Sequence, residues 1–119
     1  MSIKKLERVV KSIYETGGND IIVIDVRKVN PLCNYYVICD ANNITLTNSI
    51  AQNLEKDLKS FDISINHIEG RIGREWVLVD IDDIVVHVFL TPEREKYSLE
   101  KLWADQPLID IKEVISNYE

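Results

Sequence analysis

The 119-residue sequence has a formal net charge of −6, with 45% hydrophobic and 29% charged side chains. This length predicts one domain with a single core, and no apolar run approaches the roughly 20 residues that a membrane-spanning helix needs. Phosphate contacts require clustered lysine and arginine, so the acidic balance argues against sequence-specific binding of nucleic acid. We therefore expect a cytoplasmic protein with one domain over residues 1–106 and a C-terminal tail over residues 107–119.

The first half of the chain predicts two long helices and two strands. Residues 1–15 intersperse charges with apolar residues at helical spacing, as in an amphipathic helix and not a signal peptide, and two glycines follow. The β-branched run "IIVIDV" (21–26) and the run "NYYVICD" (34–40) each predict a strand. A second helix is expected from Asn43, with an apolar stripe formed by Leu46, Ile50, Leu54 and Leu58.

The second half predicts three strands and then short helices. Residues 62–70 alternate weakly, whereas "EWVLVDI" and "IVVHVFL" predict two strands joined as a hairpin. Thr91 is the expected N-cap of the next helix, with Pro92 at its first position, and Ser98 is the expected cap of a short final helix. This order predicts an α/β fold with a mixed sheet of four to five strands, two long helices on one face and short C-terminal helices.

The two faces of this hairpin differ in composition. One face carries only aliphatic side chains, which we assign to the core beneath the long helices. The other carries a mixture typical of protein interfaces, formed by Trp76, Leu78, Asp80, Val85, His87 and Phe89. Monomers seldom leave a large apolar patch exposed. Two alternatives stay open: a partner covers the second face, or the C-terminal tail folds over it and Trp76 and Phe89 belong to the core.

Catalytic and metal-binding patterns are weak in this sequence. Cys33 and Cys39 do not have the spacing of a zinc site, and His87 has no identifiable nucleophile beside it. Asp80 and Asp82 have the spacing with which nucleotidyl-transferring enzymes hold magnesium, but no phosphate-binding turn precedes them and Asp82 falls where the hairpin turns. We predict no catalytic residue, no metal and no cofactor, with a magnesium-dependent nucleotidyltransferase as the alternative.

The same segments resemble a known protein family. The motifs "EG" (69–70), "WVLVDIDDIVVHVF" (76–89) and "EREKYSLEKLWAD" (93–105) are similar to those of the ribosomal silencing factors, also called Iojap-like proteins. The two earlier strands and the helix containing "IAQNLEKDL" fit the same order, so the resemblance covers about residues 3–105. The chain departs from the family where Asp82 replaces a glycine of the hairpin turn and Asp40-Ala41 replaces a Thr-Gly pair.

The resemblance implies a nucleotidyltransferase-like fold without catalysis. It also implies binding to the large ribosomal subunit through large-subunit ribosomal protein fourteen, at the face where the small subunit docks. A protein bound there blocks subunit joining and represses translation when nutrients are scarce. The resemblance further implies a homodimer off the ribosome, and a simple homodimerisation module is a second alternative function.

The distribution of charge agrees with a basic ribosomal partner. Residues 75–105 contain 3 basic and 8 acidic side chains, whereas residues 1–74 contain 10 basic and 9 acidic ones. A focused negative field speeds the encounter with a positively charged partner. The residues expected to contact this partner are Trp76, Asp80, Asp83, His87, Phe89, Arg94, Glu95, Tyr97, Glu100, Leu102, Trp103 and Asp105.

Overall fold

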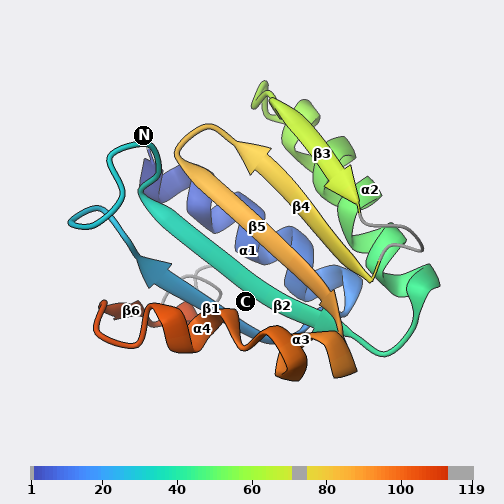
Figure 1. Cartoon of the computed structure of the whole chain (residues 1–119). Helices are drawn as coiled ribbons and strands as arrows, with labels where there is room; N and C mark the ends of the chain where they lie inside the picture. Colours follow the sequence, from blue (N-terminus) through green and yellow to red (C-terminus); the bar gives the residue numbers. More distant parts are fainter. Residues whose placement is uncertain (1, 71–74, 113–119) are drawn as a thin grey trace.

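Residues 2–70 and 75–112, which the computed structural model describes, form a mixed six-stranded sheet with helices packed against it (Figure 1). The strands lie in the order β3-β4-β5-β2-β1-β6, with β2 and β5 parallel and the other neighbours antiparallel. The predicted α/β class is confirmed, with six strands in place of four to five. In chain order the elements are α1 (Ser2–Thr16), β1 (Asn19–Asp25), β2 (Tyr35–Ala41), α2 (Ile44–Ser60), β3 (His67–Gly70), β4 (Trp76–Ile81), β5 (Ile84–Leu90), α3 (Thr91–Tyr97), α4 (Leu99–Leu102) and β6 (Leu108–Ile109).

Helices α1 and α2 pack against each other on one side of the sheet, as the sequence predicts (Figure 1). Helix α1 ends where Gly17 adopts a φ of +107° and donates its N–H to the Ile13 carbonyl. Glycine is favoured there because residues that have a Cβ are strained at positive φ. Helix α2 begins after Asn43, whose side-chain oxygen accepts the Leu46 N–H at 2.8 Å.

The main core lies between these helices and the sheet. The aliphatic faces of β4 and β5 are fully buried there, as predicted, and burial of each such side chain contributes about 1.5–3 kcal/mol. The helices bury their own apolar stripes against this surface. The buried residues are Leu6, Val9, Val10, Ile13, Ile50, Leu54 and Leu58 from the helices, and Val77, Val79, Ile81, Ile84, Val86 and Val88 from the hairpin.

Strand β3 is shorter than the sequence pattern indicates. It spans His67–Gly70, whereas alternation predicted a strand over residues 62–70. The preceding residues still wrap around the end of α2: Asp62 has a φ of +59°, and the Ile63 N–H donates to the Leu58 carbonyl at 2.9 Å. The side chains of Ile63 and Ile65 pack against the core from this loop, which explains their alternation without a strand.

The C-terminal segment differs from the expected arrangement at its caps. Leu90, and not Thr91, occupies the N-cap of α3, and the Thr91 hydroxyl instead donates to the Asp40 carboxylate at 2.9 Å. Ser98 occupies the N-cap of α4, as predicted, with a φ of +46°, but its hydroxyl donates to the Glu95 carbonyl and makes no capping bond. Strand β6, which the sequence did not predict, pairs with β1 and brings residues assigned to the tail into the sheet.

Within the described residues, no helix has both the length and the apolar character that crossing a membrane requires. Cys33 and Cys39 are free thiols and both are buried. Burial raises the pKa of the Cys39 thiol to about 12, so this side chain stays protonated and packs as a small apolar group. The interpretation of the two cysteines as buried thiols is therefore confirmed.

Candidate protein-binding surface

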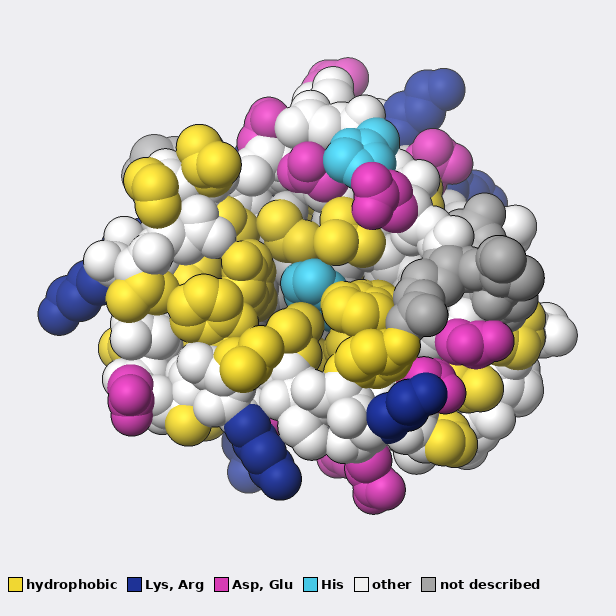
Figure 2. Space-filling view, in the orientation of Figure 1, with side chains coloured by type: hydrophobic (Ala, Val, Ile, Leu, Met, Phe, Trp, Pro, Cys, Tyr) yellow, Lys and Arg dark blue, Asp and Glu magenta, His cyan; other side chains and the backbone are white. Residues whose placement is uncertain are grey.

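The side of the sheet opposite α1 and α2 is hereafter called the open face. Strand pairing sets Trp76 against Phe89, Leu78 against His87 and Asp80 against Val85, so all six side chains emerge on this face. The predicted assignment of the two hairpin faces is thus confirmed. Figure 2 shows hydrophobic side chains gathered on this side of the molecule around a histidine, with charged side chains toward the margin.

An aromatic cluster occupies the open face. The ring of Trp76 lies 4.8 Å from Phe89 and 4.8 Å from Tyr97, measured between ring centroids. Tyr36 bridges the rest of the cluster, with its ring 5.4 Å from His87 and 5.5 Å from Trp103 in edge-on contacts. Such pairs contribute about 0.5–1.5 kcal/mol each beyond the apolar area that they bury. The cluster therefore fixes α3 and α4 against the sheet.

The C-terminal helices cover part of the open face. Phe89 is 0% exposed and His87 is 6% exposed, so the structure does not place these two side chains at the surface where partner contacts were expected. Trp76 remains partly exposed, together with Tyr97 and Trp103. The C-terminal segment thus covers the face only in part, as Phe89 is in the core and Trp76 is not fully buried. Whether a partner covers the rest stays a prediction. Tyr97, after β5, packs on Phe89, whereas the rings around His87 are those of Tyr36, Trp76 and Phe89 from the sheet itself.

His87 acts as a buried hydrogen-bond acceptor for Trp76. The indole N–H of Trp76 donates to His87 Nδ1 at 3.1 Å. Burial lowers the pKa of the imidazole from 6.5 to about 4, so the ring is neutral at physiological pH and Nδ1 can accept this bond. His87 therefore holds the orientation of Trp76 from beneath.

Arg94 clamps the C-terminal helices to the sheet. Its guanidinium donates to the buried Asp40 carboxylate at 2.8 Å and makes two bonds of 3.1 Å to the Glu100 carboxylate. Arg94 is itself only 8% exposed. The structure thus assigns Arg94 and Glu100 to an internal ion-pair network, where the sequence placed them among the residues that meet a partner. The ends of β2, α3 and α4 meet at this network.

The remaining acidic candidates lie in different surroundings. Asp83 forms an ion pair with Lys5 of α1 at 2.9 Å. Asp80 is half-buried on the open face and accepts the backbone N–H of Asp82 at 3.1 Å. Glu95 and Asp105 are exposed, as is the apolar side chain of Leu102. These four carboxylates therefore differ in exposure and in partner.

The geometry of Asp82 is that of a turn residue. Ile81 pairs with Ile84, so Asp82 and Asp83 form a two-residue hairpin loop, and Asp82 has a φ of +61°. This is the backbone region in which glycine is favoured, and Asp is one of the few other residues that adopt it. The Asp82 carboxylate accepts the side-chain amide of Asn66. No group of three or more His, Cys, Asp or Glu side chains in the described ranges is placed to hold a metal ion.

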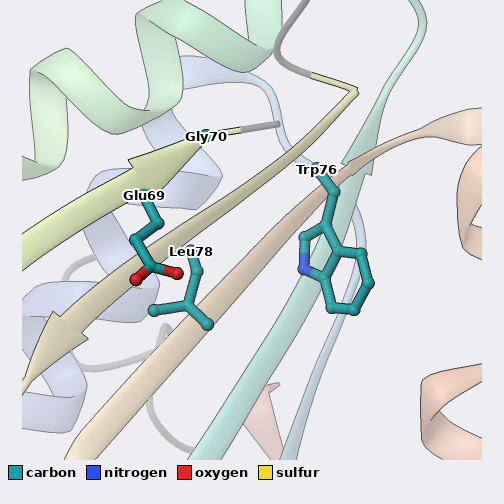
Figure 3. A pocket seen from close by; sticks show the side chains of 4 residues that line it. All are labelled: Glu69, Gly70, Trp76 and Leu78. Carbon is teal, nitrogen blue, oxygen red and sulfur yellow. The ribbon is translucent and has the colours of Figure 1, made fainter. Parts of the chain in front are cut away.

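A pocket beside Trp76 was not foreseen as a site. Glu69, Gly70, Trp76 and Leu78 line a volume of about 480 Å³ at the β3–β4 end of the open face (Figure 3). The pairing of Glu69 with Leu78 sets the carboxylate beside the apolar part of the face. In the sequence, Glu69 and Gly70 stood out only as part of the family motif. Local sequence does not show the β3–β4 register that brings them beside Trp76.

The comparisons with known proteins agree with this arrangement. A family model described as "Ribosomal silencing factor during starvation" matches residues 1–119. The ribosomal silencing factor of Halalkalibacterium halodurans is 32% identical over 111 residues, 93% of this chain and 95% of that protein, and the one of Bacillus subtilis is 38% identical over 94 residues, 79% and 80%. The crystal structure of a Chromobacterium violaceum protein is similar with a TM-score of 0.82 and 30% identity, and the match covers 85% of this chain and 84% of that one. The chain therefore belongs to the family of ribosomal silencing factors.

Proposed function

We propose that this protein binds the large ribosomal subunit and represses translation by blocking the joining of the two subunits. The family consists of ribosome-binding factors and not of enzymes, and its name refers to the silencing of ribosomes. The observation in this chain that supports the proposal is Trp76, which is held rigidly by its neighbours and yet is partly exposed on the open face. Aromatic side chains in this position are typical binding hot spots.

The proposed partner is large-subunit ribosomal protein fourteen, which the family resemblance implies. A basic ribosomal protein fits a chain with a net charge of −6. Trp76, with Leu78 and the exposed Leu102, offers apolar surface for such a contact. Glu95 and Asp105, both exposed, offer negative charge on the segment after β5. The mechanism is steric occlusion in the cytoplasm, where no bond is made or broken and no cofactor takes part.

The predicted contact residues divide into two groups under this proposal. Those with exposed surface outside the Arg94 network contact the partner directly, and they are Trp76, Asp80, Asp83, Glu95, Tyr97, Leu102, Trp103 and Asp105. Phe89 and His87 act beneath Trp76, because they are buried and fix its ring. Arg94 and Glu100 act by holding α3 and α4 in place.

Truncation of Trp76 tests the proposal. Trp76→Ala should raise the Kd for purified large subunits at least tenfold, because a central aromatic contributes about 2 kcal/mol or more to binding. Co-sedimentation with large subunits measures the Kd, and light scattering measures subunit joining, which should no longer be inhibited. The matched control is Phe61→Ala, which removes an aromatic side chain that is 48% exposed at the end of α2. A wild-type protein that does not bind large subunits would contradict the proposal, and a folded Trp76→Ala protein that binds as tightly as the wild type would remove Trp76 from the contact surface.

We further propose that the free protein is a homodimer, as the family resemblance implies. Sedimentation velocity over a hundredfold dilution measures the equilibrium between dimer and monomer. A protein that is monomeric at every concentration contradicts the homodimer. A stable dimer without affinity for large subunits would instead favour the second alternative, a simple homodimerisation module.

A further inference from the structure

We propose that the pocket beside Trp76 receives the guanidinium group of an arginine side chain from the ribosomal partner. This inference rests on the proposed function, because it names the chemistry that one part of the same surface recognises. The pocket is lined by Glu69, Gly70, Trp76 and Leu78 and has a volume of about 480 Å³. It lies on the open face where β3 pairs with β4 (Figure 3).

The strand register gives the pocket one charged wall, one aromatic wall and an apolar floor. Glu69 pairs directly with Leu78 across the β3–β4 ladder, so the two side chains project to the same side of the sheet. Trp76 is two residues before Leu78 on β4 and therefore projects to this side too. Figure 3 shows Leu78 between the Glu69 carboxylate and the Trp76 indole.

The aromatic wall is fixed before any ligand arrives. The Trp76 indole N–H already donates to His87 Nδ1 at 3.1 Å, and the ring packs on Phe89 and Tyr97 at 4.8 Å each. The indole N–H is therefore already bonded, so what Trp76 adds to the pocket lining is aromatic surface and not a hydrogen-bond donor. A cation close to such a ring is attracted by its electron-rich face, and tryptophan gives the largest effect among the aromatic side chains. Little side-chain entropy is lost on binding, because the ring does not have to reorient.

The charged wall selects a cation. The Glu69 side chain is 69% exposed, and its Oε1 lies 3.2 Å from His67 Nε2 on the same strand. His67 in turn lies 3.7 Å from the Asp80 carboxylate, so two carboxylates flank this end of the face. A neutral apolar group in the pocket would desolvate Glu69 without compensation. An anion would be repelled by the same carboxylate.

Arginine fits these walls better than the other cations. A guanidinium is planar, so it stacks on an indole while its N–H groups reach a carboxylate, whereas a lysine ammonium is a compact and strongly hydrated charge. A metal ion would need several oxygen or nitrogen ligands. Among the described residues, Glu69 is the one carboxylate that lines the pocket, and no cluster of three potential metal ligands occurs.

Two measurements test the inference. The first is the Kd for purified large subunits: Glu69→Gln should raise it about tenfold, whereas Glu55→Gln, at an exposed position of α2, should leave it within about twofold. The second uses the indole N–H resonances of the two tryptophans, assigned with a Trp103→Phe variant. Titration with acetyl-arginine amide should shift the Trp76 resonance, and the neutral analogue acetyl-citrulline amide should shift it much less. The selective shift should be lost in Glu69→Gln.

The outcomes separate this inference from the proposed function. Tight binding of large subunits by both wild type and Glu69→Gln would overturn the arginine pocket and leave the proposed function intact. Equal shifts with arginine and citrulline amides would overturn it as well. A protein that shows the selective arginine shift but does not bind large subunits would support the chemistry of the pocket while refuting the proposed function.

Discussion

Lowering the pH should destabilise the fold through His87. Burial lowers the pKa of this imidazole from 6.5 to about 4, whereas the unfolded chain keeps it near the ordinary value. Between these two values the unfolded state binds a proton that the folded state excludes, so the free energy of unfolding falls as the pH falls. From pH 7 to pH 5 the two pKa values give a loss of about 2 kcal/mol, and the full effect at lower pH is about 3 kcal/mol.

Urea unfolding at pH 7 and pH 5, followed by tryptophan fluorescence, measures this loss. The matched control is His87→Gln, because the amide does not titrate and can still accept the Trp76 indole N–H. Carboxylates that titrate in this range contribute to both proteins, so the difference between the two losses isolates His87. The wild type should lose about 2 kcal/mol more than the variant. If the two proteins lose the same free energy, His87 is not buried as the neutral acceptor described above.

Two further substitutions test the Arg94 ion-pair network and the glycine turn that follows α1. Arg94→Ala leaves the buried Asp40 carboxylate without its cation and should lower the free energy of unfolding by about 3 kcal/mol, as measured by urea denaturation. Unchanged stability would contradict an internal role for Arg94. Gly18→Ala adds a Cβ that clashes with the Ile13 side chain, so it should lower the free energy of unfolding by about 1–3 kcal/mol, as measured by thermal denaturation. The control Gln52→Ala, at an exposed position of α2, should change this free energy little.

Local sequence pattern predicts the elements whose signal is repeated over several residues. The apolar stripe of α2 and the alternation in β4 and β5 each identify an element and its buried face. Strand β6 has only two residues, Leu108 and Ile109, and exists because the edge of β1 is there to pair with. Thr91 has the local signature of an N-cap, but the Asp40 carboxylate, 51 positions earlier, captures its hydroxyl. Such long-range contacts override capping preference.

Local sequence pattern predicts the candidate protein-binding surface less completely, because that surface too depends on contacts between residues far apart in the chain. Alternation places Trp76 and Phe89 on one face, and it cannot tell which of them the C-terminal helices will cover. Arg94 lies in a motif rich in charged residues, so its burial follows only from its approach to Asp40 at the end of β2. The arginine pocket depends on the pairing of Glu69 with Leu78, and that register is a property of the folded sheet.

The parallel pairing of β2 with β5 has a consequence for synthesis of the chain. Tyr35 of β2 pairs with Ile84 of β5, so one edge of β2 stays unpaired until β5 is translated, about 50 residues later. At roughly 5–20 residues per second, the backbone N–H and C=O groups of this edge stay without their β5 partners for several seconds before β5 leaves the exit tunnel. The centre of the sheet is thus the part of the fold most open to misassociation while the chain is being translated.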